Sequence, residues 1–139
     1  MTKKEFAALA AEKIIFLDGA TGSNLMKAGM PSGVCPEDWI LNNEDALVNL
    51  QKDYVQAGTN ILYAPTFSAN SIKLAEYGLA DKQREMIHGL VALSKRAANG
   101  QALVAGDLTM TGEQLYPIGK LQFEDLINVY KEQINYMVE

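Results

Sequence analysis

Residues 14–23 read Ile-Ile-Phe-Leu-Asp-Gly-Ala-Thr-Gly-Ser, and this stretch changes from apolar to polar at Asp18. The apolar residues before Asp18 are mostly β-branched or aromatic, which is typical of a strand buried on both faces of a parallel sheet. After it, Gly19 and Gly22 allow the backbone to approach a ligand closely. Ligands of α/β folds commonly bind at turns that follow the carboxyl ends of buried strands. The stretch therefore predicts a strand that leads into a ligand-binding turn.

The composition is that of one globular domain, with 139 residues of which 48% are hydrophobic and 21% are charged. The net charge of −5 and the lack of a Lys/Arg run argue against a nucleic-acid partner. The single cysteine, Cys35, cannot form an internal disulfide and is compatible with a reducing compartment. No signal-peptide pattern is present, and no apolar run approaches the roughly 20 residues that span a bilayer. We expect a cytoplasmic chain with no membrane partner.

Two further stretches repeat the plan of an apolar strand followed by a polar turn. Residues 60–64 predict a second strand, which leads into the turn of residues 65–68, and residues 102–105 predict a third strand, which leads into Gly106 and Asp107. If the strands are parallel neighbours, their carboxyl ends meet at one edge of the sheet. We therefore expect Asp18, Thr66 and Asp107 to lie close together.

Helices are predicted between and around these strands from apolar spacing and capping residues. A leading helix over residues 3–12 is expected from the capping-box spacing of Thr2 and Glu5, with Phe6 and Leu9 covering another part of the molecule. Asn43 is expected to cap a longer helix. The other predicted helical segments are short pieces after residues 22 and 36, and longer helices over residues 44–57, 69–77, 81–99 and from 122 onwards.

Three strand–helix units without tight hairpin turns indicate a parallel β/α architecture. This pattern does not decide between an open sheet and part of a closed barrel. The apolar stripe of the last helix continues to Met137 and Val138 without a stop signal. We therefore expect residues 1–139 to be part of a longer domain.

Several motifs in this chain resemble those of the homocysteine S-methyltransferase family, including the amino-terminal homocysteine-binding module of cobalamin-dependent methionine synthases. The resemblance is collinear from Ile14 onwards, and its motifs are Leu17-Asp18-Gly19-Ala20-Thr21-Gly22-Ser23, residues 54–61, Pro65-Thr66-Phe67-Ser68-Ala69-Asn70, Gly106-Asp107-Leu108, Thr111-Gly112-Glu113 and Tyr116-Pro117. It implies a (β/α)₈ barrel. Residues 1–139 would be the truncated amino-terminal part, with three parallel β/α units after a leading helix.

The resemblance implies a parent enzyme that transfers a methyl group to homocysteine and forms methionine. The methyl donor would be methylcobalamin or methyltetrahydrofolate, with cobalamin on another module. A zinc ion on three cysteines of the later barrel would hold the substrate sulfur as a thiolate. Cys35 matches no zinc position of the family. We therefore expect no metal ligand and no catalytic residue in this chain, no bound cofactor, and no activity from it alone.

The residues that the resemblance carries over belong to the amino-acid half of the substrate site. They are Asp18, Gly19, Ala20, Thr21, Thr66, Phe67 and Asp107. In this interpretation the carboxylate of Asp18 accepts from the substrate ammonium, while the amides of residues 19–21 face its carboxylate. The alternatives are that Asp18 only caps its turn and that Asp107 is a structural acid that binds loop amides.

Two other classes of protein remain open. The chain could be a non-catalytic module that assembles with itself or with a missing half-barrel, because three barrel strands leave two open edges. It could also be an unrelated doubly wound domain with an acidic site like that of a response regulator. The long segment of residues 30–43 argues against this last reading.

Overall fold

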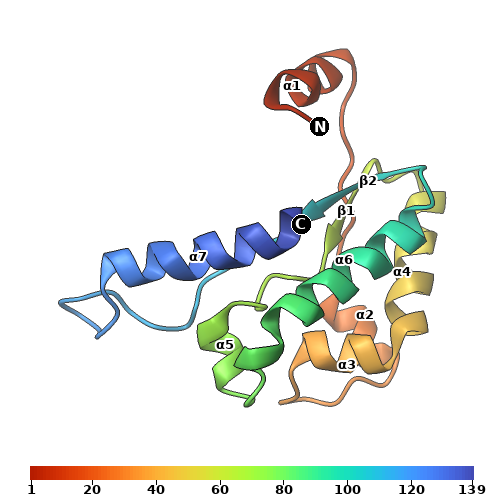
Figure 1. Cartoon of the computed structure of the whole chain (residues 1–139). Helices are drawn as coiled ribbons and strands as arrows, with labels where there is room; N and C mark the ends of the chain where they lie inside the picture. Colours follow the sequence, from red (N-terminus) through yellow and green to blue (C-terminus); the bar gives the residue numbers. More distant parts are fainter.

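The computed structural model describes residues 1–139 and contains two strands surrounded by helices (Figure 1). The elements in chain order are α1 (Lys3–Glu12), α2 (Gly22–Lys27), α3 (Pro36–Asn42), α4 (Glu44–Gln56), β1 (Ile61–Ala64), α5 (Ser71–Ala75), the 3₁₀ helix η1 (Ala80–Lys82), α6 (Gln83–Ala98), β2 (Leu103–Gly106) and α7 (Phe123–Val138). The second and third predicted strands are therefore present, each within one residue of its expected start.

β1 and β2 form a two-stranded parallel sheet, in which Ile61 lies opposite Leu103 and Ala64 lies opposite Gly106. The connection between them contains α5, η1 and α6, as a parallel pair requires, since a tight turn cannot join strands that run in the same direction. The carboxyl ends of both strands consequently lie at the same edge of the sheet.

The first predicted strand is reduced to one parallel bridge, between Leu17 and Ile61. The chain does run beside β1 there, because Asn60 N donates to Phe16 O at 2.8 Å and Asp18 N donates to Ile61 O at 3.1 Å. The expectation of a strand buried on both faces is wrong, since Ile14 is 78% and Phe16 60% exposed. The reason is that this segment pairs with a strand on one side only.

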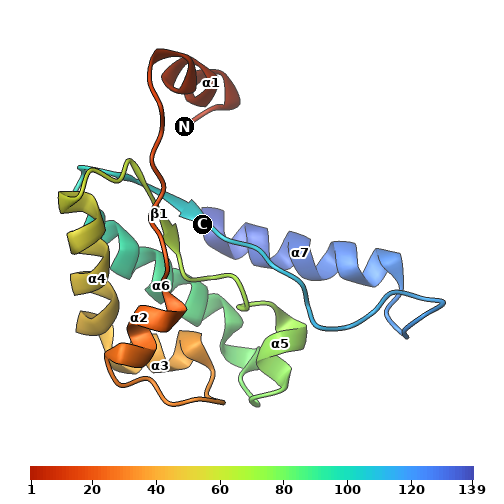
Figure 2. The ribbon, with the colours of Figure 1, turned by 180° about the vertical axis from the view of Figure 1, so that it is seen from behind.

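The core lies on one face of the sheet, where α6 runs between α4 and α7 in both views of the molecule (Figures 1 and 2). Leu62 and Ala64 of β1 point to this face and are fully buried. The main core cluster is Leu25, Ile40, Leu47, Val48, Leu62, Leu90, Leu93, Ala97 and Ala98. On the other face of β1, Tyr63 is 37% exposed but Ile61 is 7% exposed, so the core helices cover one side of the sheet and the other side is only partly covered.

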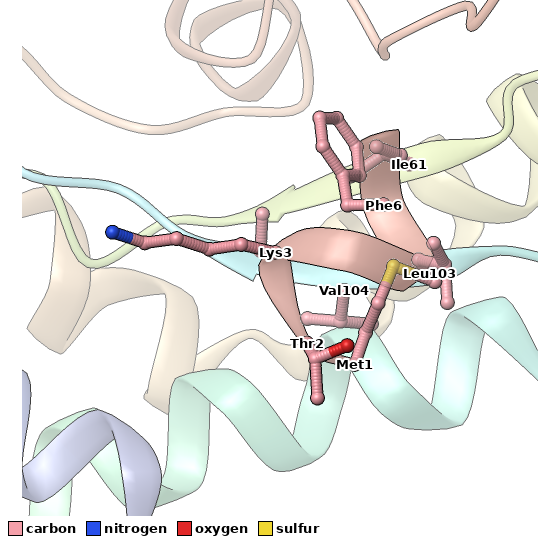
Figure 3. A pocket seen from close by; sticks show the side chains of 8 residues that line it. Met1, Thr2, Lys3, Phe6, Ile61, Leu103 and Val104 are labelled. Atoms are coloured by element: carbon pink, nitrogen blue, oxygen red, sulfur yellow. The ribbon is translucent and has the colours of Figure 1, made fainter. Parts of the chain in front are cut away.

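α1 stands apart from the rest of the molecule (Figure 1). Its capping box is present, since Glu5 N donates to Thr2 Oγ1 at 3.2 Å and Thr2 N donates to Glu5 Oε2 at 2.6 Å. No residue of α1 is buried and Phe6 is 45% exposed, so the expectation that this helix covers another element is wrong. An open groove of about 420 Å³ separates α1 from β1 and β2 (Figure 3).

Two other helices differ from their expected form. Asn43 occupies the N-cap position of α4, but its side chain donates to Trp39 O at 2.9 Å instead of capping the helix. In α7 only Gln133 is buried, while Phe123 is 61% and Ile134 43% exposed, because α6 and α5 cover only part of the predicted apolar stripe. No helix in the structure is both long enough and apolar enough to span a membrane.

Candidate functional site

Asp18 lies at the carboxyl end of the segment that pairs with β1. Both of its carboxylate oxygens lie 3.2 Å from the backbone nitrogen of Tyr63, which donates to them. Partial burial raises the pKa of Asp18 above its ordinary value of 3.8, and the negative charge of Asp107 raises it further. The Tyr63 N–H and the Gln51 side-chain amide act in the opposite direction. Asp18 and Asp107 are therefore close enough to interact.

The backbone N–H groups of residues 19–21 donate to no acceptor within the protein. The turn is instead held through a carbonyl, because Ala20 O accepts from Tyr54 Oη at 3.1 Å and from Asn24 Nδ2 at 2.7 Å. A Cβ on Gly19 would lie 3.0 Å from Tyr54 Oη, so a side chain at this position would displace the tyrosine. The result is a fixed turn with three unpaired donors.

Thr66 joins the ends of β1 and β2. Its hydroxyl donates to Asp107 O at 2.9 Å and accepts from Asp107 N at 3.0 Å, so it closes the gap where the two strands separate. Thr66 is fully buried, whereas the side chain of Asp107 remains partly exposed and receives no hydrogen bond. The Asp107 carboxylate is therefore free to contact a ligand.

Hydrogen bonds do not connect all of the predicted site residues to one another. Phe67 is partly exposed and makes no hydrogen bond to Asp18 or Asp107. No hydrogen bond joins the turn of residues 19–21 to Thr66 or Asp107. The candidate site therefore consists of two neighbouring groups of residues. One group is Asp18 with the turn of residues 19–21, and the other is Thr66 with Asp107.

Three buried polar side chains, which were not predicted from the sequence, form hydrogen bonds to the backbone of these two groups or of the residues next to them. Gln51 Nε2 donates to Tyr63 O at 2.8 Å, and Gln133 Nε2 donates to Thr66 O at 2.7 Å. Glu37, which is fully buried, accepts from Ser68 N at 3.0 Å. Two of them could have been found from the sequence, because Gln51 and Gln133 lie on the apolar stripes of their helices. A glutamine at such a position is expected to be buried, and a buried amide needs a specific hydrogen-bond partner.

The arrangement has the polarity of a site for an amino acid. A carboxylate such as that of Asp18 attracts an ammonium group, and a set of unpaired backbone N–H groups attracts a carboxylate. Both kinds of group lie at the carboxyl ends of parallel strands, where ligands of α/β proteins usually bind. The fold and this polarity define the class as a parallel α/β protein with a candidate site for a small zwitterion.

Comparison with solved structures shows the same fold. The chain is similar to the homocysteine methyltransferase MmuM from Escherichia coli in its metallated form, with a TM-score of 0.78 and 19% identity over 94% of this chain and 52% of that one. Its similarity to the oxidized form has a TM-score of 0.77 and 20% identity, over 96% of this chain and 52% of that one. The two-stranded parallel sheet and its helices thus match part of a homocysteine methyltransferase barrel.

Residues 15–139 match the family described as Homocysteine S-methyltransferase, and the chain belongs to this family. It is 27% identical over 117 residues to a methionine synthase of Mycobacterium leprae (strain TN), which covers 80% of this chain and 9% of that protein. It is also 27% identical over 95 residues to a methionine synthase of Mycobacterium tuberculosis (strain ATCC 25618 / H37Rv), covering 64% and 8% respectively. The chain thus spans a small part of these relatives and about half of the solved structures.

The residues of this chain do not fit the zinc ion that the family uses. No three His, Cys, Asp or Glu side chains lie close enough together to hold a metal ion. Cys35 is 6% exposed and donates to Glu37 Oε2 at 3.4 Å, and burial raises the pKa of its thiol to about 11. A zinc ligand must instead be a thiolate with access to the metal. No step of methyl transfer is therefore assigned to a residue of this chain.

Proposed function

We propose that residues 1–139 form the amino-terminal part of a homocysteine-binding (β/α)₈ barrel, with the segment before Asp18, β1 and β2 as its first three strands. In this proposal the chain binds the amino-acid end of homocysteine. The residues that contact it are Asp18, Gly19, Ala20, Thr21, Thr66, Phe67 and Asp107.

The observation that carries this proposal is that one turn presents both a carboxylate, on Asp18, and free backbone N–H groups, on residues 19–21. The Asp18 carboxylate has lone pairs to spare beyond its bond to Tyr63 N, so it can accept from the substrate ammonium. The free N–H groups of residues 19–21 can donate to the substrate carboxylate. Asp107 adds a second negative charge on the ammonium side.

The complete reaction is proposed for a longer parent protein. There the homocysteine sulfur takes a methyl group from methylcobalamin or methyltetrahydrofolate, and methionine is the product. Zinc on residues outside this chain supplies the thiolate, and cobalamin is carried by another module. The 139 residues alone are inactive in this proposal, and the protein works in the cytoplasm.

The test is a titration of the isotope-labelled chain with L-homocysteine, followed by NMR. We expect the amide signals of residues 19–21 and the side-chain signal of Asp18 to shift. L-Methionine should bind equally well, because nothing in this chain contacts the sulfur. By contrast, 4-mercaptobutyrate lacks the ammonium group and 3-aminopropanethiol lacks the carboxylate, so neither should bind. Equal shifts with these analogues, or shifts confined to other regions, would contradict the proposal.

A second candidate function is assembly, because the outer edge of β2 has no partner strand. Leu103 on this strand is 36% exposed, and Leu108 and Met110 just beyond it are 40% and 74% exposed. Unpaired strand edges with apolar side chains readily recruit another strand. The partner would be a second copy of the chain or the remaining half of a barrel.

Light scattering at several protein concentrations tests the assembly of copies. A mass that rises with concentration in the wild type, and falls to that of a monomer in Leu103→Lys, would support it. Tyr77→Lys is the matched control, since Tyr77 is 44% exposed but lies outside the sheet. A single monomeric species at all concentrations would exclude self-association.

A further inference from the structure

The parallel pairing between the segment before Asp18 and β1 consists of one bridge, between Leu17 and Ile61. Asp18 N donates to Ile61 O, and in a regular parallel pair the next two bonds would join Tyr63 N to Asp18 O and Ala20 N to Tyr63 O. Neither of these bonds is present. Two side chains satisfy the backbone of Tyr63 in their place.

The first of these side chains is that of Asp18, whose carboxylate accepts from Tyr63 N at 3.2 Å. The second belongs to Gln51 of α4, whose Nε2 donates to Tyr63 O at 2.8 Å. Gln51 therefore occupies the acceptor that Ala20 N would otherwise use. The N–H of Ala20 has no partner in the protein.

Gln51 is an unusual residue for its position. It is 1% exposed, on a helix face that otherwise packs Leu47 and Val48 into the core. Its Oε1 atom has no hydrogen-bond partner. An unpaired buried amide oxygen is unfavourable, so an apolar side chain would stabilise the core better unless the N–H of Gln51 is required.

We propose that Gln51 is a positioning residue, which by binding Tyr63 O stops the strand pairing and keeps the turn of residues 18–21 open for the amino-acid end of the substrate. It touches no substrate atom itself. It acts through Tyr63, whose N–H orients the Asp18 carboxylate, and through Ala20, whose N–H it leaves free. This role rests on the proposed function, because that function gives the open turn its ligand.

The chain contains a matched control for this proposal. Gln83 of α6 is 3% exposed, and its Nε2 donates to Ala69 O at 3.0 Å. It therefore makes the same kind of bond as Gln51, from a buried amide to a backbone carbonyl, but to a residue that is not among the proposed substrate contacts. Gln51→Met and Gln83→Met remove equivalent amides, and methionine has nearly the same volume as glutamine.

Two measurements on the 139-residue chain test the role of Gln51. The first is the titration of the Asp18 carboxyl carbon by NMR without any amino acid, in the wild type and both variants. We expect a higher midpoint in Gln51→Met, because the Gln51 amide lowers the pKa of Asp18, and an unchanged midpoint in Gln83→Met. The second is the affinity for L-homocysteine, which should fall about fivefold in Gln51→Met only, a change equivalent to about 1 kcal/mol.

The outcomes separate this inference from the proposed function. If the wild type does not bind homocysteine, the function fails, and the Asp18 titration still decides whether Gln51 positions that carboxylate. If homocysteine binds and both variants match the wild type in midpoint and affinity, the function stands and the role of Gln51 is overturned. Equal changes in the two variants would likewise overturn it, because they would reflect a general loss of packing.

A third measurement needs no variant and applies if Gln51→Met does not fold. In the wild type, the side-chain amide signals of Gln51 should shift with the titration of Asp18, while those of Gln83 should not. The proposal would be overturned if the chemical shifts of the Gln51 amide did not change during the titration of Asp18. Signals that follow it, together with slow hydrogen exchange of the Gln51 side chain, would support it.

Discussion

The carboxylate of Asp18 stands where a main-chain carbonyl would stand in a longer strand, with both oxygens 3.2 Å from Tyr63 N. Because Asp18 N donates to Ile61 O, the next acceptor for Tyr63 N in a parallel pair would be Asp18 O. The side chain replaces this carbonyl, and the chain turns away from β1 after Asp18. The side chains of Asp18 and Gln51 thus both bind the backbone of Tyr63 in place of the chain, and Asp18 presents a negative charge at the start of the open turn.

Replacing Asp18 by Asn tests whether this charge binds the substrate ammonium. Asn keeps the shape and an oxygen that can accept from Tyr63 N, so the fold should remain. The charge-assisted bond to the ammonium is lost, and the affinity for L-homocysteine should fall by roughly tenfold or more. Isothermal titration calorimetry measures this change, while circular dichroism follows the fold.

The matched control is Asp53→Asn, which removes one exposed carboxylate from α4 without changing the turn. It should leave the affinity within about twofold of the wild type, because exposed charges at a distance are screened by salt. A similar loss in both variants would show that net charge, and not the position of Asp18, controls binding.

The pKa of Asp18 also predicts how the stability of the chain depends on pH. Burial raises this pKa above 3.8, so the folded state holds the Asp18 proton more tightly than the unfolded state. The resulting stabilisation is complete below pH 3.8 and is lost as the pH rises through the higher folded value. Urea unfolding at a series of pH values should therefore show the wild type losing stability relative to Asp18→Asn over this range. A difference that does not change with pH would contradict the raised pKa.

Sequence patterns predicted the parts of the fold that depend on local spacing. The capping box of Thr2 and Glu5, the strands β1 and β2 and the long helix that ends near residue 99 follow from residues near one another in the chain. The predicted meeting of the second and third turns agrees with the bonds between Thr66 and Asp107. The sequence also indicated the family to which the chain belongs.

What the sequence did not predict depends on neighbours that are distant in the chain. The apolar run before Asp18 looks like a buried strand, but its burial depends on a second partner strand and a covering helix, which this structure does not provide. The role of Gln51 is equally hidden, because nothing in α4 shows that its amide faces Tyr63 O. The helical pattern of α7 likewise gave its apolar stripe without showing how much of it other helices cover.

Replacing Thr66 by Val tests the connection between β1 and β2. Valine has nearly the same shape but no hydroxyl, so the N–H and the C=O of Asp107 would both lose their partner. Unpaired groups of this kind typically reduce the free energy of unfolding by about 2 kcal/mol. Thr66→Ser keeps the hydroxyl and should lose less. Urea denaturation of both variants gives the comparison, and equal losses would mean that the methyl group and not the hydroxyl matters.

Cys35 provides a test of the small core cluster that it forms with Leu74 and Met86 beside α3. Its thiol pKa is raised to about 11 by burial, so it should react very slowly with Ellman's reagent at pH 8 in the folded chain and quickly in urea. The raised pKa also stabilises the fold below the ordinary value of 9.0, and this contribution is lost as the pH rises from 9.0 towards 11. The stability difference between the wild type and Cys35→Ala should therefore shrink between pH 8 and 10.5. Rapid reaction of the native thiol at pH 8 would show instead that Cys35 is accessible as a thiolate, and would reopen the question of whether it can bind a metal.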